Sequence, residues 1–175
     1  MARPVRLETH SVTIRAPAAL VFQMMSAFDR GRIKAGDGES STVLERSGDV
    51  VLAKFKTRAG PFTVTTVERV TLEPHTRLTF EHVSGPLRHA REEFVLREVP
   101  GGTEFEHSGE FVWSAVPVVG WLVGVLLLKR PFERVLVRHM AAIKSAAEAR
   151  AEQRATSFAW TRPPDGLVVP TALRA

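Results

Sequence analysis

With 175 residues, 44% of them hydrophobic, the chain is long enough for one domain with a sizeable core and a tail. It contains no cysteine, which excludes disulfides and thiolate metal sites and fits a reducing cytoplasm. The formal net charge is +5, but no block of lysine and arginine is interleaved with aromatic residues, so we expect no nucleic-acid partner.

The N-terminal part of the chain indicates a strand followed by a helix, and its first six residues lack the apolar segment of a signal peptide. Residues 7–15 alternate between two faces, which is typical of a strand with one buried face. Pro17 can occupy a first helical turn, and residues 18–28 form a compact apolar helix. Residues 29–40 are charged and contain three glycines, so they predict a short helical turn and then a flexible loop.

Six further strands are predicted between the loop and the C-terminal region, over residues 42–46, 49–57, 62–72, 77–83, 87–99 and 103–114. Turns that contain glycine or proline separate them, and Ser47-Gly48 in particular indicates a tight hairpin. Such short connections favour consecutive antiparallel pairs. Together with residues 7–15 these segments make seven strands.

The C-terminal region indicates one long helix. The apolar run 115–128 is shorter than the ~18 residues that a membrane-spanning helix needs. After Pro131, where we expect a break or kink, apolar residues recur at three- and four-residue steps to about Arg154. One long helix behind many strands predicts a sheet curled around that helix, with a pocket between them. Residues 156–175 contain three prolines and no periodicity, which indicates an extended tail.

Three segments resemble a known family. They are HSVTIRAPAALV (10–21), PGGTEF (100–105) and LLLKRPFERVLVRHMAAIK (126–144). These correspond to an opening strand that runs into Pro and a helix, a Gly-Gly-Thr turn before the last strand, and a final helix. Over residues 7–154 the chain resembles the START-like or SRPBCC superfamily, in particular its polyketide cyclase/dehydrase-type branch.

The resemblance implies an α+β helix-grip fold. In this fold a seven-stranded antiparallel curved sheet wraps around a long C-terminal helix, and two short helices follow the first strand. Residues 1–155 would form the ligand-binding domain and residues 156–175 the tail. Members of the superfamily bind lipids, sterols, polyketides or hormones, and only some catalyse reactions. No strict active-site signature is present, so no residue role is carried over.

The parity of the last two strands predicts which side chains face the helix. On the last strand the apolar set includes Phe105, and His107 shares its face. A two-residue Pro100-Gly101 turn would pair His107 with Phe94 and would turn Glu92 inward as well. A two-residue Gly85-Pro86 turn would instead turn Glu93 inward, so keeping Glu92 inside requires a longer loop or a bulge. Glu92 and Glu93 therefore remain alternative candidates.

Four polar side chains are predicted to point into one cavity, namely His82, Glu92, His107 and His139. A carboxylate near imidazoles can orient a ligand hydroxyl or carbonyl, or act as a general acid–base pair, which makes Glu92, His107 and His139 the catalytic candidates. The alternative is that each is a satisfied polar group of the core. No His-x-x-x-His spacing, phosphate-binding glycine loop or nucleophile motif is present, so we expect neither a metal nor a cofactor.

These observations leave three functional hypotheses. The first is a module that binds a mainly apolar small molecule, such as a lipid or a polyketide-like compound. The predicted ligand-binding residues are Phe55, Val64, Phe80, His82, Glu92, Phe94, His107, Phe111, Trp113, Leu136, His139 and Met140. The second is a cyclase or dehydratase that uses a Glu/His pair. The third is a cytoplasmic protein that rests on an anionic membrane through residues 115–138, a segment that includes Lys129 and Arg130.

Overall fold

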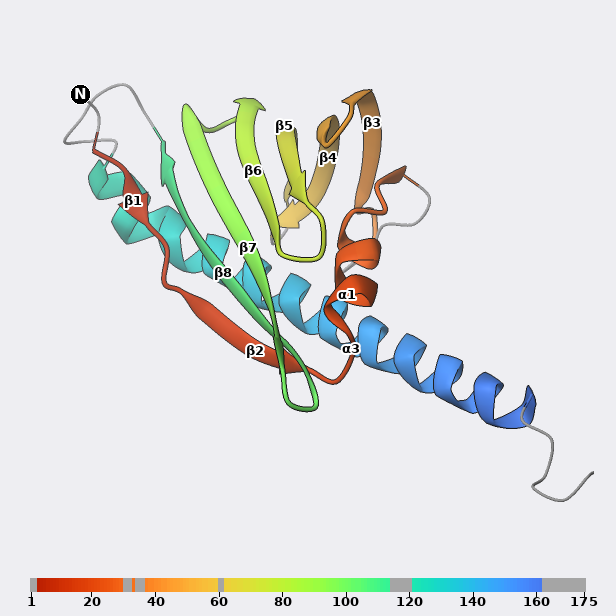
Figure 1. Cartoon of the computed structure of the whole chain (residues 1–175). Helices are drawn as coiled ribbons and strands as arrows, with labels where there is room; N and C mark the ends of the chain where they lie inside the picture. Colours follow the sequence, from red (N-terminus) through yellow and green to blue (C-terminus); the bar gives the residue numbers. More distant parts are fainter. Residues whose placement is uncertain (1–2, 30–32, 34–36, 60–61, 114–120, 162–175) are drawn as a thin grey trace, which may run out of the picture.

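The computed structural model describes residues 3–29, 33, 37–59, 62–113 and 121–161 (Figure 1). The elements are, in chain order, β1 (Val5–Arg6), β2 (His10–Ile14), α1 (Ala18–Met25), β3 (Ser40–Ser47), β4 (Val50–Ala59), β5 (Phe62–Glu73), β6 (Arg77–Ser84), β7 (His89–Val99), β8 (Gly102–Val112), the π-helical segment η2 (Gly124–Leu128) and α3 (Lys129–Thr161).

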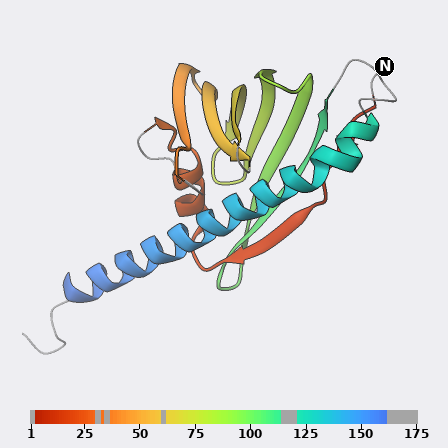
Figure 2. The same ribbon diagram turned by 180° about the vertical axis from the view of Figure 1, so that it is seen from behind.

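The strands form one curved antiparallel sheet in the order β1-β8-β7-β6-β5-β4-β3, and β2 also pairs with β8. Helix α3 lies across one face of this sheet, and its C-terminal turns extend past the sheet edge (Figure 2). Helix α1 packs against α3 and β7; its place beside the long helix can be followed in Figure 1. The predicted architecture, a curved antiparallel sheet with a long C-terminal helix, is therefore confirmed.

The N-terminal elements differ in detail from the sequence-based predictions. The strand predicted over residues 7–15 is limited to β2, and the separate strand β1 precedes it; both pair with β8. The hairpin between β3 and β4 turns at Gly48-Asp49 rather than at Ser47-Gly48, because Ser47 pairs with Val50. Gly48 has a positive φ of 56°, which suits glycine. The second short helix was predicted within residues 29–40, of which the structure describes Asp29, Ile33 and residues 37–40, so this prediction lies largely outside the described part.

The strand registers settle which glutamate faces the helix. The predicted β7–β8 pairing is confirmed, since Phe94 lies opposite His107 and Glu92 lies opposite Gly109. Between β6 and β7 the connection covers residues 85–88, which is longer than a two-residue turn. As a result Phe80 pairs with Glu92, and the inward face of β7 carries Glu92 rather than Glu93.

The break expected near Pro131 does not occur, and the alternative of a kink there stays a prediction. Helix α3 runs without interruption through this residue, and the π-helical segment η2 directly precedes it. A π-helical turn is an irregularity that a helix can absorb without ending. The helix also continues to Thr161, so residues 156–161 belong to α3 rather than to an extended tail, and residues 162–175 lie outside the described part.

Two apolar clusters join the sheet to the helices. The larger one packs α3 and α1 on the middle of the sheet, with Leu78 and Phe105 fully buried and Leu136 and Met140 contributed by α3. The smaller one lies at the β1 end, where Phe111 stacks on Phe132 with ring centroids 5.4 Å apart. Side chains of both clusters border the cavity that the helix and the sheet enclose.

Candidate ligand-binding cavity

A cavity of about 330 Å³ lies between the inner face of the sheet and α3, a volume at the lower end of the usual range for small-molecule sites. Strands β4 to β7, the β8 end, helix α1, the end of η2 and α3 all contribute to its lining. Most lining side chains are apolar. The polar members among the described residues are Thr57, Thr66, Glu68, His82, Glu92 and His139.

Neighbouring phenylalanines form much of the apolar wall. The ring of Phe80 lies 6.0 Å from that of Phe55 and 5.6 Å from that of Phe94, measured between centroids. These rings come from β6, β4 and β7, whose pairing and parity turn them to the same face. The wall therefore offers a continuous aromatic surface to an apolar ligand.

The structure places ten of the twelve predicted ligand-binding residues along the cavity, which are Phe55, Val64, Phe80, His82, Glu92, Phe94, Phe111, Trp113, Leu136 and His139. The other two, His107 and Met140, are buried in the core and do not line it. The predicted ligand-binding set omitted further lining residues, among them Met24 on α1, Phe28 just after α1, and Phe132 and Val135, which the helical spacing had placed on the buried stripe of α3. The sequence shows that these side chains are apolar, but it does not show how far α3 lies from the sheet.

The most distinctive polar contact of the cavity joins Glu92 to His107. Nε2 of His107 lies 2.9 Å from Oε2 of Glu92, as the pairing of β7 with β8 allows. The Glu92 side chain keeps 20% exposure and lines the cavity, whereas His107 is fully buried behind it. Glu93 points to the other face, where it pairs with Arg91 at 2.8 Å. Of these two adjacent glutamates, Glu92 is thus the one that a ligand would meet.

The surroundings of His107 define its hydrogen bonding. Its Nδ1 is buried without a partner, and its ring lies 4.7 Å from that of Phe94. A proton on Nε2 can be donated to the Glu92 carboxylate, and Nδ1 then carries only a lone pair. His107 therefore fixes the orientation of Glu92 from behind.

A second polar group lies on the same face of the sheet, around His82. His82 pairs across the strands with Glu68, whose Oε1 accepts a 2.6 Å hydrogen bond from Thr66 Oγ1. Burial lowers the pKa of His82 and the charge of His89 lowers it further, against the effect of a hydrogen bond to the Leu87 carbonyl. His82 is therefore neutral near pH 7, and its Nε2, which has no protein partner, is an acceptor.

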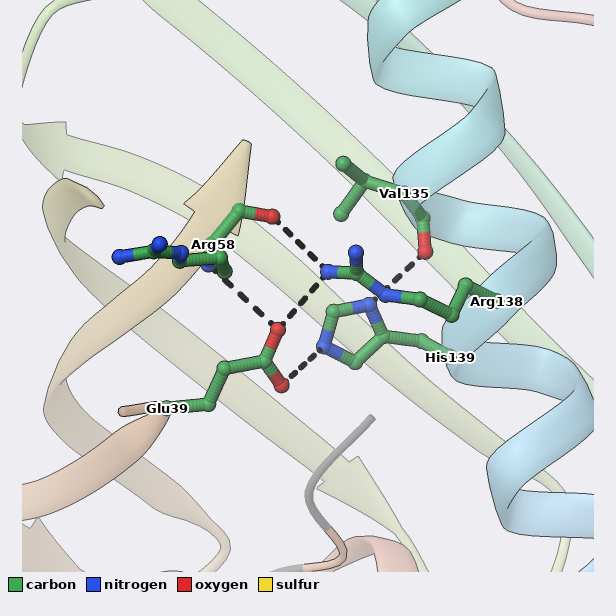
Figure 3. Close-up of polar contacts among 5 residues, drawn as sticks. All are labelled: Glu39, Arg58, Val135, Arg138 and His139. Atoms are coloured by element: carbon green, nitrogen blue, oxygen red, sulfur yellow. Dashed lines mark hydrogen bonds and ion pairs between the residues drawn. The ribbon is translucent and has the colours of Figure 1, made fainter. Parts of the chain in front are cut away.

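The third polar group could not be predicted from the sequence, because it depends on Glu39 (Figure 3). Glu39 comes from the segment that we predicted as a flexible loop, yet its side chain is fully buried. Its Oε1 accepts a 2.9 Å hydrogen bond from Arg138 Nη2, and its Oε2 lies 3.0 Å from His139 Nε2. Arg138 Nη2 also donates to the Arg58 carbonyl at 2.8 Å. The network ties α3 to the start of β3 and the end of β4.

His139 lines the cavity, but both of its ring nitrogens already have partners in the protein. Nε2 contacts Glu39, and Nδ1 lies 2.9 Å from the carbonyl oxygen of Val135, one turn earlier in α3 (Figure 3). Glu92, in contrast, faces the cavity with a carboxylate that His107 contacts through one oxygen. Among the described residues no three histidine or acidic side chains gather so as to hold a metal ion.

Comparisons with known proteins agree with this architecture. The family described as "Polyketide cyclase / dehydrase and lipid transport" matches residues 8–148. A comparison with curated proteins found no match. The Zhui aromatase/cyclase from Streptomyces sp. R1128 is similar in structure, with a TM-score of 0.66 and 20% identity over 87% of this chain and 96% of that one.

Two further solved structures share the fold. The protein TTHA0849 from Thermus thermophilus has a TM-score of 0.67 and 15% identity, over 85% of this chain and 99% of that one. A START superfamily protein from Mycobacterium smegmatis has a TM-score of 0.64 and 15% identity, over 86% of this chain and 99% of that one. At these identities the likeness establishes the fold alone.

Proposed function

Because the chain belongs to the polyketide cyclase/dehydrase and lipid transport family, we propose that it binds a mainly apolar small molecule in the cavity between the sheet and α3. The observation that carries the proposal is a cavity of about 330 Å³ whose wall is largely phenylalanine and aliphatic side chains. Each methylene of a ligand that moves from water into such a wall gains about 0.8 kcal/mol. A lipid or a polyketide-like compound has the required apolar surface.

The polar groups of the cavity favour a ligand with hydrogen-bond donors. Glu92 presents a carboxylate held by His107, and a carboxylate accepts hydrogen bonds rather than donating them. No lysine or arginine is among the described lining residues. A hydroxyl, phenol or amine on an otherwise apolar molecule would satisfy Glu92, whereas a ligand carboxylate placed next to it would be repelled.

The experiment starts with native mass spectrometry of the purified protein to identify a co-purified molecule. Binding is then measured with naphthol and with naphthalene, which differ only in a hydroxyl donor. We expect both to bind and naphthol to bind more tightly. In Glu92→Gln the preference for naphthol should fall by about 1 kcal/mol, because the amide oxygen of glutamine still accepts a hydrogen bond but carries no charge.

The adjacent residue provides the matched control. Glu93→Gln removes the same charge from the outward face of the same strand, so the naphthol preference should stay as in the wild type. The proposal fails when neither probe binds. The role of Glu92 in recognising the hydroxyl donor is contradicted if both variants lose the preference for naphthol equally, or if neither variant loses it.

A second candidate is an enzyme of the cyclase or dehydratase kind, and the 2.9 Å contact between Glu92 and His107 is the observation in its favour. A carboxyl group that faces the ligand with an imidazole behind it can transfer protons, an effect that contributes roughly 10²–10⁴-fold to a rate. We expect the co-purified molecule to be released unchanged after incubation with the protein. Turnover that disappears in Glu92→Gln while binding persists would make the enzyme the better proposal.

A further inference from the structure

The outer side of the helix that covers the cavity exposes a group of large apolar side chains. Leu126 and Leu127 are 70% and 65% exposed, and Leu122 and Val137 are 43% and 47% exposed. Leu122 lies in the helical turn before η2, and the others follow at helical spacing along η2 and the first turns of α3, so all four lie on one side of the helix. Leucines at this level of exposure, gathered on one face, typically mark an interaction surface.

Two arginines continue the same side of the helix. Arg130 and Arg134 are exposed and spaced by one turn, and neither has an ion-pair partner among the described residues. The neighbouring basic residues do have ion-pair partners, since Lys129 pairs with Glu133 and Arg138 pairs with Glu39. Glu133 is also occupied by the Glu8 backbone N–H. The exposed leucines are therefore followed by two positive charges that lack a counter-ion within the described part of the protein.

We propose that this face, which we call the Leu/Arg face (Leu122, Leu126, Leu127, Arg130, Arg134 and Val137), docks on the surface of an anionic lipid bilayer. Exposed leucines can enter the boundary between headgroups and acyl chains, while arginines beside them contact phosphate groups. No helix among the described residues is long and apolar enough to cross a bilayer. Docking would therefore be peripheral.

The position of the Leu/Arg face links docking to the cavity. Leu128, Pro131, Phe132 and Val135 belong to the same turns, but they line the cavity. The same stretch of helix thus has lipid on one side and the ligand site on the other. This link rests on the proposed function, because it supposes that the cavity holds an apolar molecule; the docking itself does not depend on it.

The test is co-sedimentation of the full-length protein with phosphatidylcholine vesicles that contain or lack phosphatidylglycerol, at low and at high salt. We expect partitioning into the anionic vesicles to be about tenfold or more above that into the neutral ones, and to fall at high salt, where charges are screened. Leu126→Gln with Leu127→Gln, and separately Arg130→Gln with Arg134→Gln, should each lower partitioning about tenfold.

Matched controls come from the sheet. Phe62→Gln removes an apolar side chain that is 72% exposed, and Arg46→Gln with Arg69→Gln removes two exposed arginines, all far along the chain from the Leu/Arg face. These variants should partition as the wild type does. Circular dichroism checks that every variant is folded, and if the leucine variant unfolds, the exposed arginine pair still decides the question.

Several outcomes would overturn the proposal. These are no sedimentation with anionic vesicles, equal binding to both vesicle types, or control variants as weak as those of the Leu/Arg face. Light scattering provides one more: a wild-type dimer that the leucine substitutions convert to a monomer, without vesicle binding, would assign the face to self-association. Naphthol binding without vesicles is measured in parallel, so failure of docking and failure of the proposed cavity function are distinguishable.

Discussion

Oε2 of Glu39 lies 3.0 Å from Nε2 of His139, one hundred positions later in the chain. The Glu39 side chain has no exposure to solvent, and the carboxylate also accepts a hydrogen bond from Arg138. A buried carboxylate is tolerated only where charged or polar donors surround it. The network therefore determines where α3 lies over the β3 and β4 end of the sheet, and hence the shape of the cavity below it.

The first prediction concerns Glu39→Gln. The substitution keeps the size of the side chain but removes the charge that Arg138 and His139 contact, so we expect a loss of about 1–3 kcal/mol in the free energy of unfolding. Urea unfolding at neutral pH measures it. Glu45→Gln, on the exposed part of β3, is the control and should change stability by less than about 0.5 kcal/mol. Equal stability of the two variants would show that the network does not hold the helix.

The contrast between Glu39 and Glu92 shows what sequence analysis could reach. The inward position of Glu92 followed from a two-residue turn at Pro100-Gly101, because such a turn fixes the parity of both strands and places His107 next to Phe94. The Gly85-Pro86 connection had no such constraint, and the choice between Glu92 and Glu93 needed the actual length of the loop.

Glu39 gave no comparable signal. It lies in a charged, glycine-containing segment without periodicity, and its partners are a hundred residues away. The one indication was on the helix, where His139 lies on the predicted buried stripe and requires a polar partner. The existence of a pocket could be predicted from a sheet curled around a helix. Its volume could not, since it depends on how closely the helix approaches the sheet.

The second prediction compares three leucines in different environments. Leu78→Ala removes a fully buried side chain of the core and should cost about 2–5 kcal/mol through lost transfer energy and a new cavity. Leu136 is 5% exposed but already borders the cavity, so Leu136→Ala should cost less, about 2 kcal/mol. Leu126 is 70% exposed, and Leu126→Ala should stay within about 0.5 kcal/mol.

Thermal or urea unfolding of the three variants ranks their stabilities, and the naphthol affinity provides a second readout. We expect Leu136→Ala to change this affinity, because it widens the cavity, while Leu78→Ala leaves it close to the wild type in the folded protein. A melting temperature of Leu136→Ala equal to that of the wild type would show that the buried face of α3 is misassigned.

The third prediction concerns the pH dependence of the hydrogen bonds that join α3 to the end of β2. Oε1 of Glu148 accepts 2.9 Å hydrogen bonds from the Arg15 backbone N–H and from Lys144, whose ammonium also contacts the Thr13 carbonyl. These contacts, the Arg15 N–H above all, lower the pKa of Glu148 from 4.5 to about 2. Between these values the unfolded chain binds more protons than the folded one, so stability rises with pH across the window.

The contribution of Glu148 should accordingly be complete above a pH of about 4.5 and be lost as the pH falls to about 2. Glu148→Gln should be less stable than the wild type near neutral pH, and the difference should shrink as the solution is acidified through this window. Glu152→Gln, an exposed residue one turn further along α3, is the control. A difference between Glu148→Gln and the wild type that is independent of pH would contradict the assignment.

The last prediction tests the geometry behind Glu92 without altering Glu92 itself. Gly109 lies opposite Glu92 across β7 and β8, and a Cβ at this position would approach the Arg91 carbonyl to 2.9 Å and Glu92 Cγ to 3.1 Å. Gly109→Ala should therefore displace the Glu92 side chain from His107. We expect a loss of about 1–3 kcal/mol in stability from overpacking, and a naphthol preference reduced as in Glu92→Gln.

Gly48→Ala separates these two effects. Gly48 occupies a hairpin turn with a φ of 56°, and no atom lies within 4 Å of a Cβ added there, so the substitution introduces backbone strain of about 1–2 kcal/mol far from the cavity. This variant should lose stability but keep the full difference in affinity between naphthol and naphthalene. The contrary result is a Gly109→Ala variant that loses stability but keeps the affinity difference between naphthol and naphthalene. That result would show that the alignment of Glu92 with His107 does not determine how the cavity recognises a donor, because the carboxylate then acts without the histidine behind it.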